Sequence, residues 1–84
     1  MSYQVVIRSS AEKEMDTLPG PFHKRTAAKI EGLAVNPRPT GCIKLSGTDG
    51  YRIRIGDYRV VYTVDDKASL VTVIGIGHRR DIYR

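Results

Sequence analysis

Residues 51–64 read YRIRIGDYRVVYTV, two runs of alternating residues around a central Gly-Asp pair. Alternation places successive side chains on opposite faces of a strand, and a Gly-Asp connection between two such runs is typical of a β-hairpin. We therefore predict strands over 51–55 and 58–64, joined by a tight turn. Tyr51, Ile53 and Ile55 then share one face of the first strand, and Arg52 and Arg54 share the other.

The sequence on either side of this hairpin predicts further strands. Residues 3–8 and 42–45 are short β-rich or apolar runs. Residues 70–76 are apolar at nearly every position, which is expected of a strand covered on both faces. After residue 76 the chain is too charged for a buried strand.

Two helices are predicted between the first strand and the rest. The first begins at Ser9, where Glu12 follows in capping-box spacing, and ends at the Pro-Gly-Pro of residues 19–21. The second covers residues 22–35, and its apolar side chains fall on one arc of the helix. We interpret the basic residues outside that arc as a solvated face, with a nucleic-acid or acidic-partner contact as the alternative. They are Lys24, Arg25 and Lys29.

Length and composition limit the class of protein. With 84 residues, 40% of them hydrophobic and 27% charged, the chain fits one folded domain over residues 1–84. We expect an α+β fold, with an N-terminal strand, two helices on one sheet face and an antiparallel meander of three to four strands. Its single cysteine, Cys42, excludes an internal disulfide and is expected in the core. One Cys and two His cannot furnish a four-ligand zinc site.

The charge and the terminal sequence limit the location and the partner. No apolar run is long enough for a membrane span, and the first residues lack a signal-peptide pattern, so we expect a cytoplasmic protein. The excess of 14 Lys+Arg over 9 Asp+Glu gives a net charge of +5, which favours a polyanionic partner.

The arginines of the hairpin are the candidate phosphate-binding groups. Arg59 of the second strand can lie beside Arg52 and Arg54, and Arg79 leaves the last strand nearby. The guanidinium fork matches phosphate oxygens, and like charges this close favour an anion among them. The alternative is an ordinary wet, charged strand face.

The last residues, GHRRDIYR from 77 to 84, add two candidate groups. His78 can donate or accept a proton near neutral pH, and Tyr83 can stack on a base. The alternatives are a surface histidine and an aromatic lid on the core. A phosphate loop of the P-loop type, a pair of carboxylates in a cleft and a nucleophile elbow are all absent from the sequence.

Four segments together resemble the RelE/ParE superfamily of bacterial and archaeal toxins, and its RelE branch most closely. They are KLSG (44–47), YRIR (51–54), GDYRVVY (56–62) and IGHRRDIY (76–83). The resemblance implies a microbial-ribonuclease-like fold and the toxin of a type II toxin–antitoxin pair. It implies a metal-independent and cofactor-free endoribonuclease that cleaves mRNA in the decoding site of the ribosome. RelE-type enzymes use the RNA 2′-hydroxyl as nucleophile, leave a 2′,3′-cyclic phosphate, and are silenced by a cognate RelB-like antitoxin.

The resemblance also implies roles for single residues. Arg59 and Arg79 match phosphate-stabilising arginines of the family, and Tyr83 matches its base-stacking tyrosine. Arg52 and Arg54 stand where the best-known members carry lysines. Because arginine stays protonated, it is a poor general base, so we assign the acid or base role to His78. We expect substrate contacts from two further basic residues, Lys44 and Arg80.

Two other functions remain open from the sequence. One is a non-catalytic inhibitor of DNA gyrase like the ParE branch, although ParE-type chains usually lack the clustered catalytic set. The other is a small basic RNA-binding protein without toxicity.

Overall fold

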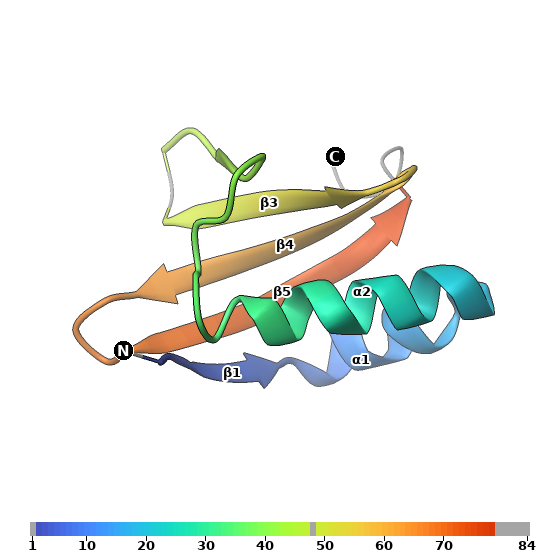
Figure 1. Cartoon of the computed structure of the whole chain (residues 1–84), viewed down its shortest axis with the longest axis horizontal. Helices are drawn as coiled ribbons and strands as arrows, with labels where there is room; N and C mark the ends of the chain where they lie inside the picture. The colour runs from blue at the N-terminus through green and yellow to red at the C-terminus, as the bar shows by residue number, and fades with distance from the viewer. Residues whose placement is uncertain (1, 48, 79–84) are drawn as a thin grey trace.

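Five strands form one mixed sheet in the computed structural model, which describes residues 2–47 and 49–78 (Figure 1). The strands are β1 (Gln4–Ile7), β2 (Ile43–Lys44), β3 (Gly50–Ile55), β4 (Tyr58–Asp65) and β5 (Leu70–His78), in the spatial order β1-β5-β4-β3-β2. The last four form the predicted antiparallel meander. The first strand, β1, lies at the far edge, parallel to β5.

The predicted β3–β4 hairpin is confirmed, and its turn requires glycine. Ile55 pairs with Tyr58, so only Gly56 and Asp57 connect the strands. Gly56 has φ +59°, a left-handed conformation that glycine adopts without steric cost. A Cβ atom at this position would also stand 2.8 Å from the ring of Phe22. The turn therefore packs closely on the helical layer.

Both helices lie on one face of the sheet, as predicted. They are α1 (Ser9–Asp16) and α2 (Gly20–Gly32). Their buried side chains meet those of β3, β4 and β5 in one core that contains Leu33, Tyr62 and Val73. None of the helices in the described part of the chain is long and apolar enough to cross a membrane.

The helix ends differ from the sequence prediction. The capping box does not form, because Arg8 is the N-cap of α1 and Ser9 is already helical. The second helix begins at Gly20 rather than residue 22, with Pro21 in its first turn. A proline is tolerated there because first-turn N–H groups have no partner within the helix. The Pro-Gly-Pro segment therefore both ends one helix and starts the next.

The strand β5 departs from the prediction in length and in burial. It continues to His78, because Gly77 and His78 pair with β4. A bulge follows from the register, since Val61 pairs with Gly75 but Tyr62 pairs with Val73. The prediction that this strand is buried on both faces is wrong. The buried residues are Val71, Val73 and Ile76, whereas Leu70, Thr72 and Ile74 are half-buried.

The helices leave the opposite sheet face uncovered within residues 2–47 and 49–78. This open face carries apolar and basic side chains together. By the register of the strands they are Val6, Ile43, Arg52, Arg54, Arg59, Val61 and Ile74, and the polar Thr72 lies among them.

Candidate nucleic-acid interface

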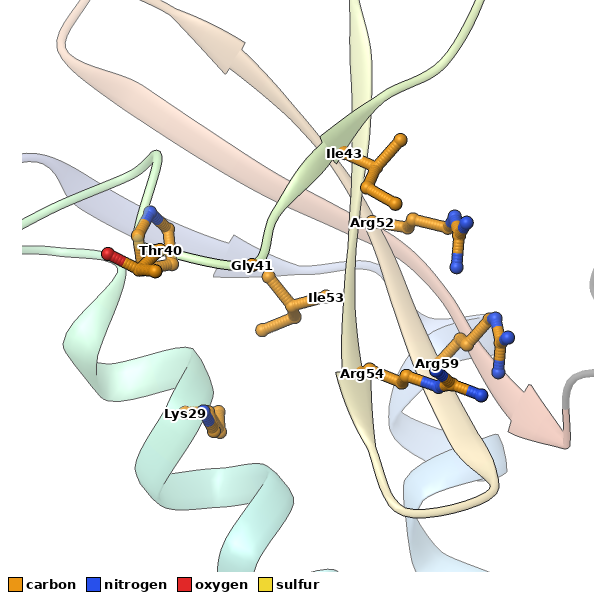
Figure 2. Close-up of a pocket in the computed structure, with 9 residues that line it drawn as sticks. Lys29, Thr40, Gly41, Ile43, Arg52, Ile53, Arg54 and Arg59 are labelled. Atoms are coloured by element: carbon orange, nitrogen blue, oxygen red, sulfur yellow. The ribbon is translucent and has the colours of Figure 1, made fainter.

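The register of the β3–β4 hairpin brings three arginines together on the open face. Arg54 pairs directly with Arg59, and Arg52 pairs with Val61, one step along on the same face. Figure 2 shows these three side chains on the same side of the strands, whereas Ile53 points to the other side, toward α2. The predicted grouping of Arg59 with Arg52 and Arg54 is therefore confirmed.

This grouping brings like charges close together and partly buries them. Like charges directly opposite each other across two strands destabilise a sheet. Arg59 is only 7% exposed, so its charge is largely removed from water, which adds a desolvation cost. An anion placed among the guanidiniums would offset both effects.

A cavity of about 360 Å³ lies at the outer edge of β3, beside this arginine cluster. One side is lined by Arg52, Arg54 and Arg59, and the other by Lys29 of α2 and the loop 39–41 (Figure 2). Among the described residues, four basic side chains and no carboxylate line it. The cavity is therefore suited to a negatively charged ligand that consists of more than one chemical group.

An ion pair fixes the loop that forms the outer wall of the cavity. The guanidinium of Arg38 donates to both carboxylate oxygens of Asp66, at 2.8 and 3.1 Å, and to the Tyr51 hydroxyl at 2.9 Å. The Tyr3 hydroxyl also donates to Asp66, at 2.7 Å. Hydrogen bonds from Arg38 and Tyr3 hold the pKa of Asp66 below its usual value. This network joins the loop to β3, the β4–β5 turn and the N-terminal segment.

A buried tyrosine holds the same loop from inside. The Tyr62 hydroxyl donates to the Pro37 carbonyl oxygen at 2.8 Å, and its ring stacks on that of Tyr51. Burial raises the pKa of Tyr62, so the phenol remains a neutral donor. The sequence did not predict these anchors or Thr40, because partners far apart in the chain leave no local pattern. Lys29 was predicted only as part of a solvated face, with a nucleic-acid contact as the alternative.

The structure does not bring His78 to the arginine cluster. His78 pairs with Tyr58, whose side chain faces the helices, and the two rings meet edge to face with centroids 5.8 Å apart. Tyr58 packs in turn on Phe22, at 4.9 Å between centroids. The alternation of β5, which is longer than predicted, thus places His78 on the face opposite Arg59.

Among the other predicted site residues, Lys44 is the one that lies in the described part of the chain, and it does not join the cluster. Lys44 is exposed on β2 and pairs with Tyr51, so it lies on the helix side of the sheet. Three others, Arg79, Arg80 and Tyr83, lie outside the described residues. Cys42 packs against the core, as predicted.

Comparison with known proteins identifies the family. The profile of the family described as "ParE toxin of type II toxin-antitoxin system, parDE" matches residues 5–83. The chain is 36% identical to Toxin RelE of Mycobacterium tuberculosis, over 98% of this chain and 87% of that protein. It is 32% identical to Toxin RelG of the same organism, over 100% of this chain and 99% of the relative.

Solved structures match in fold over nearly the whole chain. The archaeal RelE–RelB complex from Pyrococcus horikoshii contains a chain that is 33% identical, with a TM-score of 0.86, covering 96% of this chain and 99% of that one. The intact RelBE toxin–antitoxin complex of E. coli matches at 30% identity and a TM-score of 0.80, covering 92% and 96%. The chain therefore belongs to the RelE/ParE superfamily, as a RelE-type toxin of a type II toxin–antitoxin system.

Proposed function

We propose that this toxin is a ribosome-dependent endoribonuclease that cleaves mRNA in the decoding site. The observation that carries the proposal is the cavity in which Arg52, Arg54 and Arg59 meet and to which the described residues contribute no carboxylate. Its cationic lining and guanidinium forks suit the phosphodiester of an RNA strand. A ribosomal substrate would place the protein in the cytoplasm.

The proposed reaction is a transfer of the phosphoryl group within the RNA. The 2′-oxygen attacks the adjacent phosphorus, the bond from phosphorus to the 5′-oxygen breaks, and the products are a 2′,3′-cyclic phosphate and a 5′-hydroxyl. The transition state carries extra negative charge on the phosphoryl oxygens. Positioned guanidiniums stabilise that charge in a partly dehydrated site. Arg79 and Tyr83 stay predicted as a second phosphate-stabilising group and a base-stacking group.

The three arginines of the cavity cannot supply both of the proton transfers that the reaction needs. The 2′-hydroxyl must lose a proton and the leaving 5′-oxygen must gain one. Arginines remain protonated and cannot take the first proton. The assignment of His78 as acid or base stays a prediction that its placement does not support. We propose that water or groups of the ribosomal RNA complete the transfer.

Incubation of the purified toxin with mRNA-programmed ribosomes tests the proposal. We expect cuts in phase with the codons, and a 2′,3′-cyclic phosphate on each upstream fragment. A message with a 2′-deoxy nucleotide at the cut position should remain intact there, because it lacks the nucleophile. Intact mRNA in cells that the toxin has arrested would contradict the proposal.

A second candidate function is inhibition of DNA gyrase, which the ParE description of the matching family favours. Arrest with uncut mRNA and a DNA-damage response would indicate this function. Growth unaffected by expression of the lone chain would instead indicate a non-toxic RNA-binding protein.

We also propose that a cognate, RelB-like antitoxin covers the open face. Val6 on that face is 41% exposed, and it lies on a sheet surface that also carries Ile43 and Ile74. Related chains were solved in complex with RelB. Apolar side chains and a group of positive charges together suit an amphipathic segment with acidic residues.

The antitoxin should raise the melting temperature of the toxin. Binding to the folded state alone adds about 2.7 kcal/mol at 100 times the Kd. For a domain of this size that corresponds to a shift of roughly 10 °C or more. Differential scanning calorimetry of the toxin with and without its antitoxin measures the shift. An unchanged melting temperature at saturating antitoxin would count against the partnership.

A further inference from the structure

The cavity continues past the arginine cluster to the helix side of β3. Its far wall consists of the exposed Lys29 on α2, and of Thr40 and Gly41 in the loop. Figure 2 shows Lys29 and Thr40 on the opposite side of β3 from the three arginine side chains. One continuous cavity therefore has cationic groups at both ends, with the edge of β3 between them.

The edge of β3 is accessible there because β2 is short. Its two residues pair only with Tyr51 and Arg52. If β2 continued in the same register, Gly41 would lie opposite Arg54. Gly41 instead has a φ of +94°, which turns the chain away from the edge of β3. The strand β3 is thus uncovered at the position where the cavity lies.

The alternation of the hairpin determines which backbone groups face this edge. A two-residue hairpin closes on a hydrogen-bonded pair, which here is Ile55 with Tyr58. Ile53 then also forms backbone hydrogen bonds with β4. Arg54 directs its backbone N–H and C=O away from β4, to the part of the β3 edge that β2 does not cover. The backbone N–H of Arg54 adds a donor between the two ends of the cavity.

We propose that Lys29 and Thr40 form a second phosphate subsite, so that the RNA strand held by the arginine cluster crosses the edge of β3 beside Arg54. The proposal rests on the proposed function, since it extends the substrate contacts of the same cavity. Lys29 supplies the charge, and the Thr40 hydroxyl supplies a hydrogen bond to a phosphate oxygen.

The size and charge of the cavity support two phosphates rather than one. Its volume of about 360 Å³ lies in the range of sites for small organic ligands, about 300–1,000 Å³. Four cationic side chains line the cavity at its two ends, where they can contact two consecutive phosphates.

The salt dependence of binding to a single-stranded 2′-O-methyl RNA trinucleotide tests the subsite. This probe cannot be cleaved because its 2′-oxygen is blocked. Each neutralised phosphate of a single strand contributes about 0.7 to the slope of log K against log salt concentration. Lys29→Ala should therefore lower the magnitude of the slope by about 0.7, and Lys29→Arg should restore it. Thr40→Ala should weaken binding about 2- to 10-fold without a change of slope.

Lys24→Ala is the matched control, because Lys24 is an exposed lysine of the same helix that does not line the cavity. Its slope should equal that of the unmodified chain. Equal slopes for Lys29→Ala and Lys24→Ala would overturn the subsite, as would the absence of trinucleotide binding at low salt. Ribosomal mRNA cleavage is measured separately. If the chain cleaves mRNA but Lys29→Ala leaves the salt slope unchanged, only the subsite is refuted. If Lys29→Ala lowers the slope but the chain does not cleave mRNA, only the proposed function is refuted.

Discussion

Replacing Arg59 by alanine should lower the rate of mRNA cleavage on the ribosome by about 100- to 1,000-fold. This is the usual effect of removing one preorganised donor from a site that stabilises transition-state charge. Arg59 should have the largest effect of the three arginines because it is the most buried, and electrostatic interactions strengthen as water is excluded. Arg59→Lys should retain part of the rate, since lysine keeps the charge but loses the planar fork.

Two further variants separate a catalytic effect from a loss of folding. Arg54 pairs with Arg59 but is exposed, so Arg54→Ala should lower the cleavage rate and leave the melting temperature nearly unchanged. Arg8→Ala removes an exposed arginine outside the cavity and should leave the rate unchanged. Single-turnover cleavage of programmed ribosomes measures all of these rates. Full activity in both Arg54→Ala and Arg59→Ala would refute the role of the cluster.

Replacing Leu33 by alanine should cause a large loss of stability. Leu33 follows α2, has no exposed surface and belongs to the core between the helices and the sheet. Truncation of a buried leucine costs about 2–5 kcal/mol, whereas a chain of this length has roughly 4–13 kcal/mol in total. The melting temperature should therefore fall by about 10 °C or more.

Val35 offers the matched control two residues away. It is 78% exposed, so Val35→Ala should change the free energy of unfolding by no more than about 0.5 kcal/mol. Urea unfolding monitored by circular dichroism measures both variants. Similar midpoints for Leu33→Ala and Val35→Ala would show that the assigned core is wrong.

Alternation alone predicted the central part of the candidate site. A period of two assigns Arg52 and Arg54 to one face, and a two-residue turn places Arg59 opposite Arg54. These are local rules, so the prediction of the three arginine positions required no knowledge of the other strands or of the helical layer. The same local rule failed for His78, because the charged residues after it masked the continuation of β5 and so its pairing with Tyr58.

The other wall of the cavity could not be predicted in this way. Lys29 lies on the outer arc of a helix wheel, and only the position of α2 beside the edge of β3 makes it a cavity residue. Arg38 and Asp66 are an ordinary charged pair in the sequence, and their ion pair depends on how the loop crosses the sheet. Contacts between distant segments, rather than propensities, decide these features.

The parallel pairing of β1 with β5 has a consequence for synthesis of the toxin. Gln4 pairs with Leu70, so β1 cannot join the sheet until β5 has been made. Long-range pairing of this kind slows folding, because the chain loses the entropy of loop closure before it gains the favourable energy of the strand contacts. The strand β4, which carries Arg59, gains its second neighbour only when β5 arrives. A nascent chain therefore lacks the completed sheet until β5 has left the ribosome, which delays activity against the ribosome that is making it.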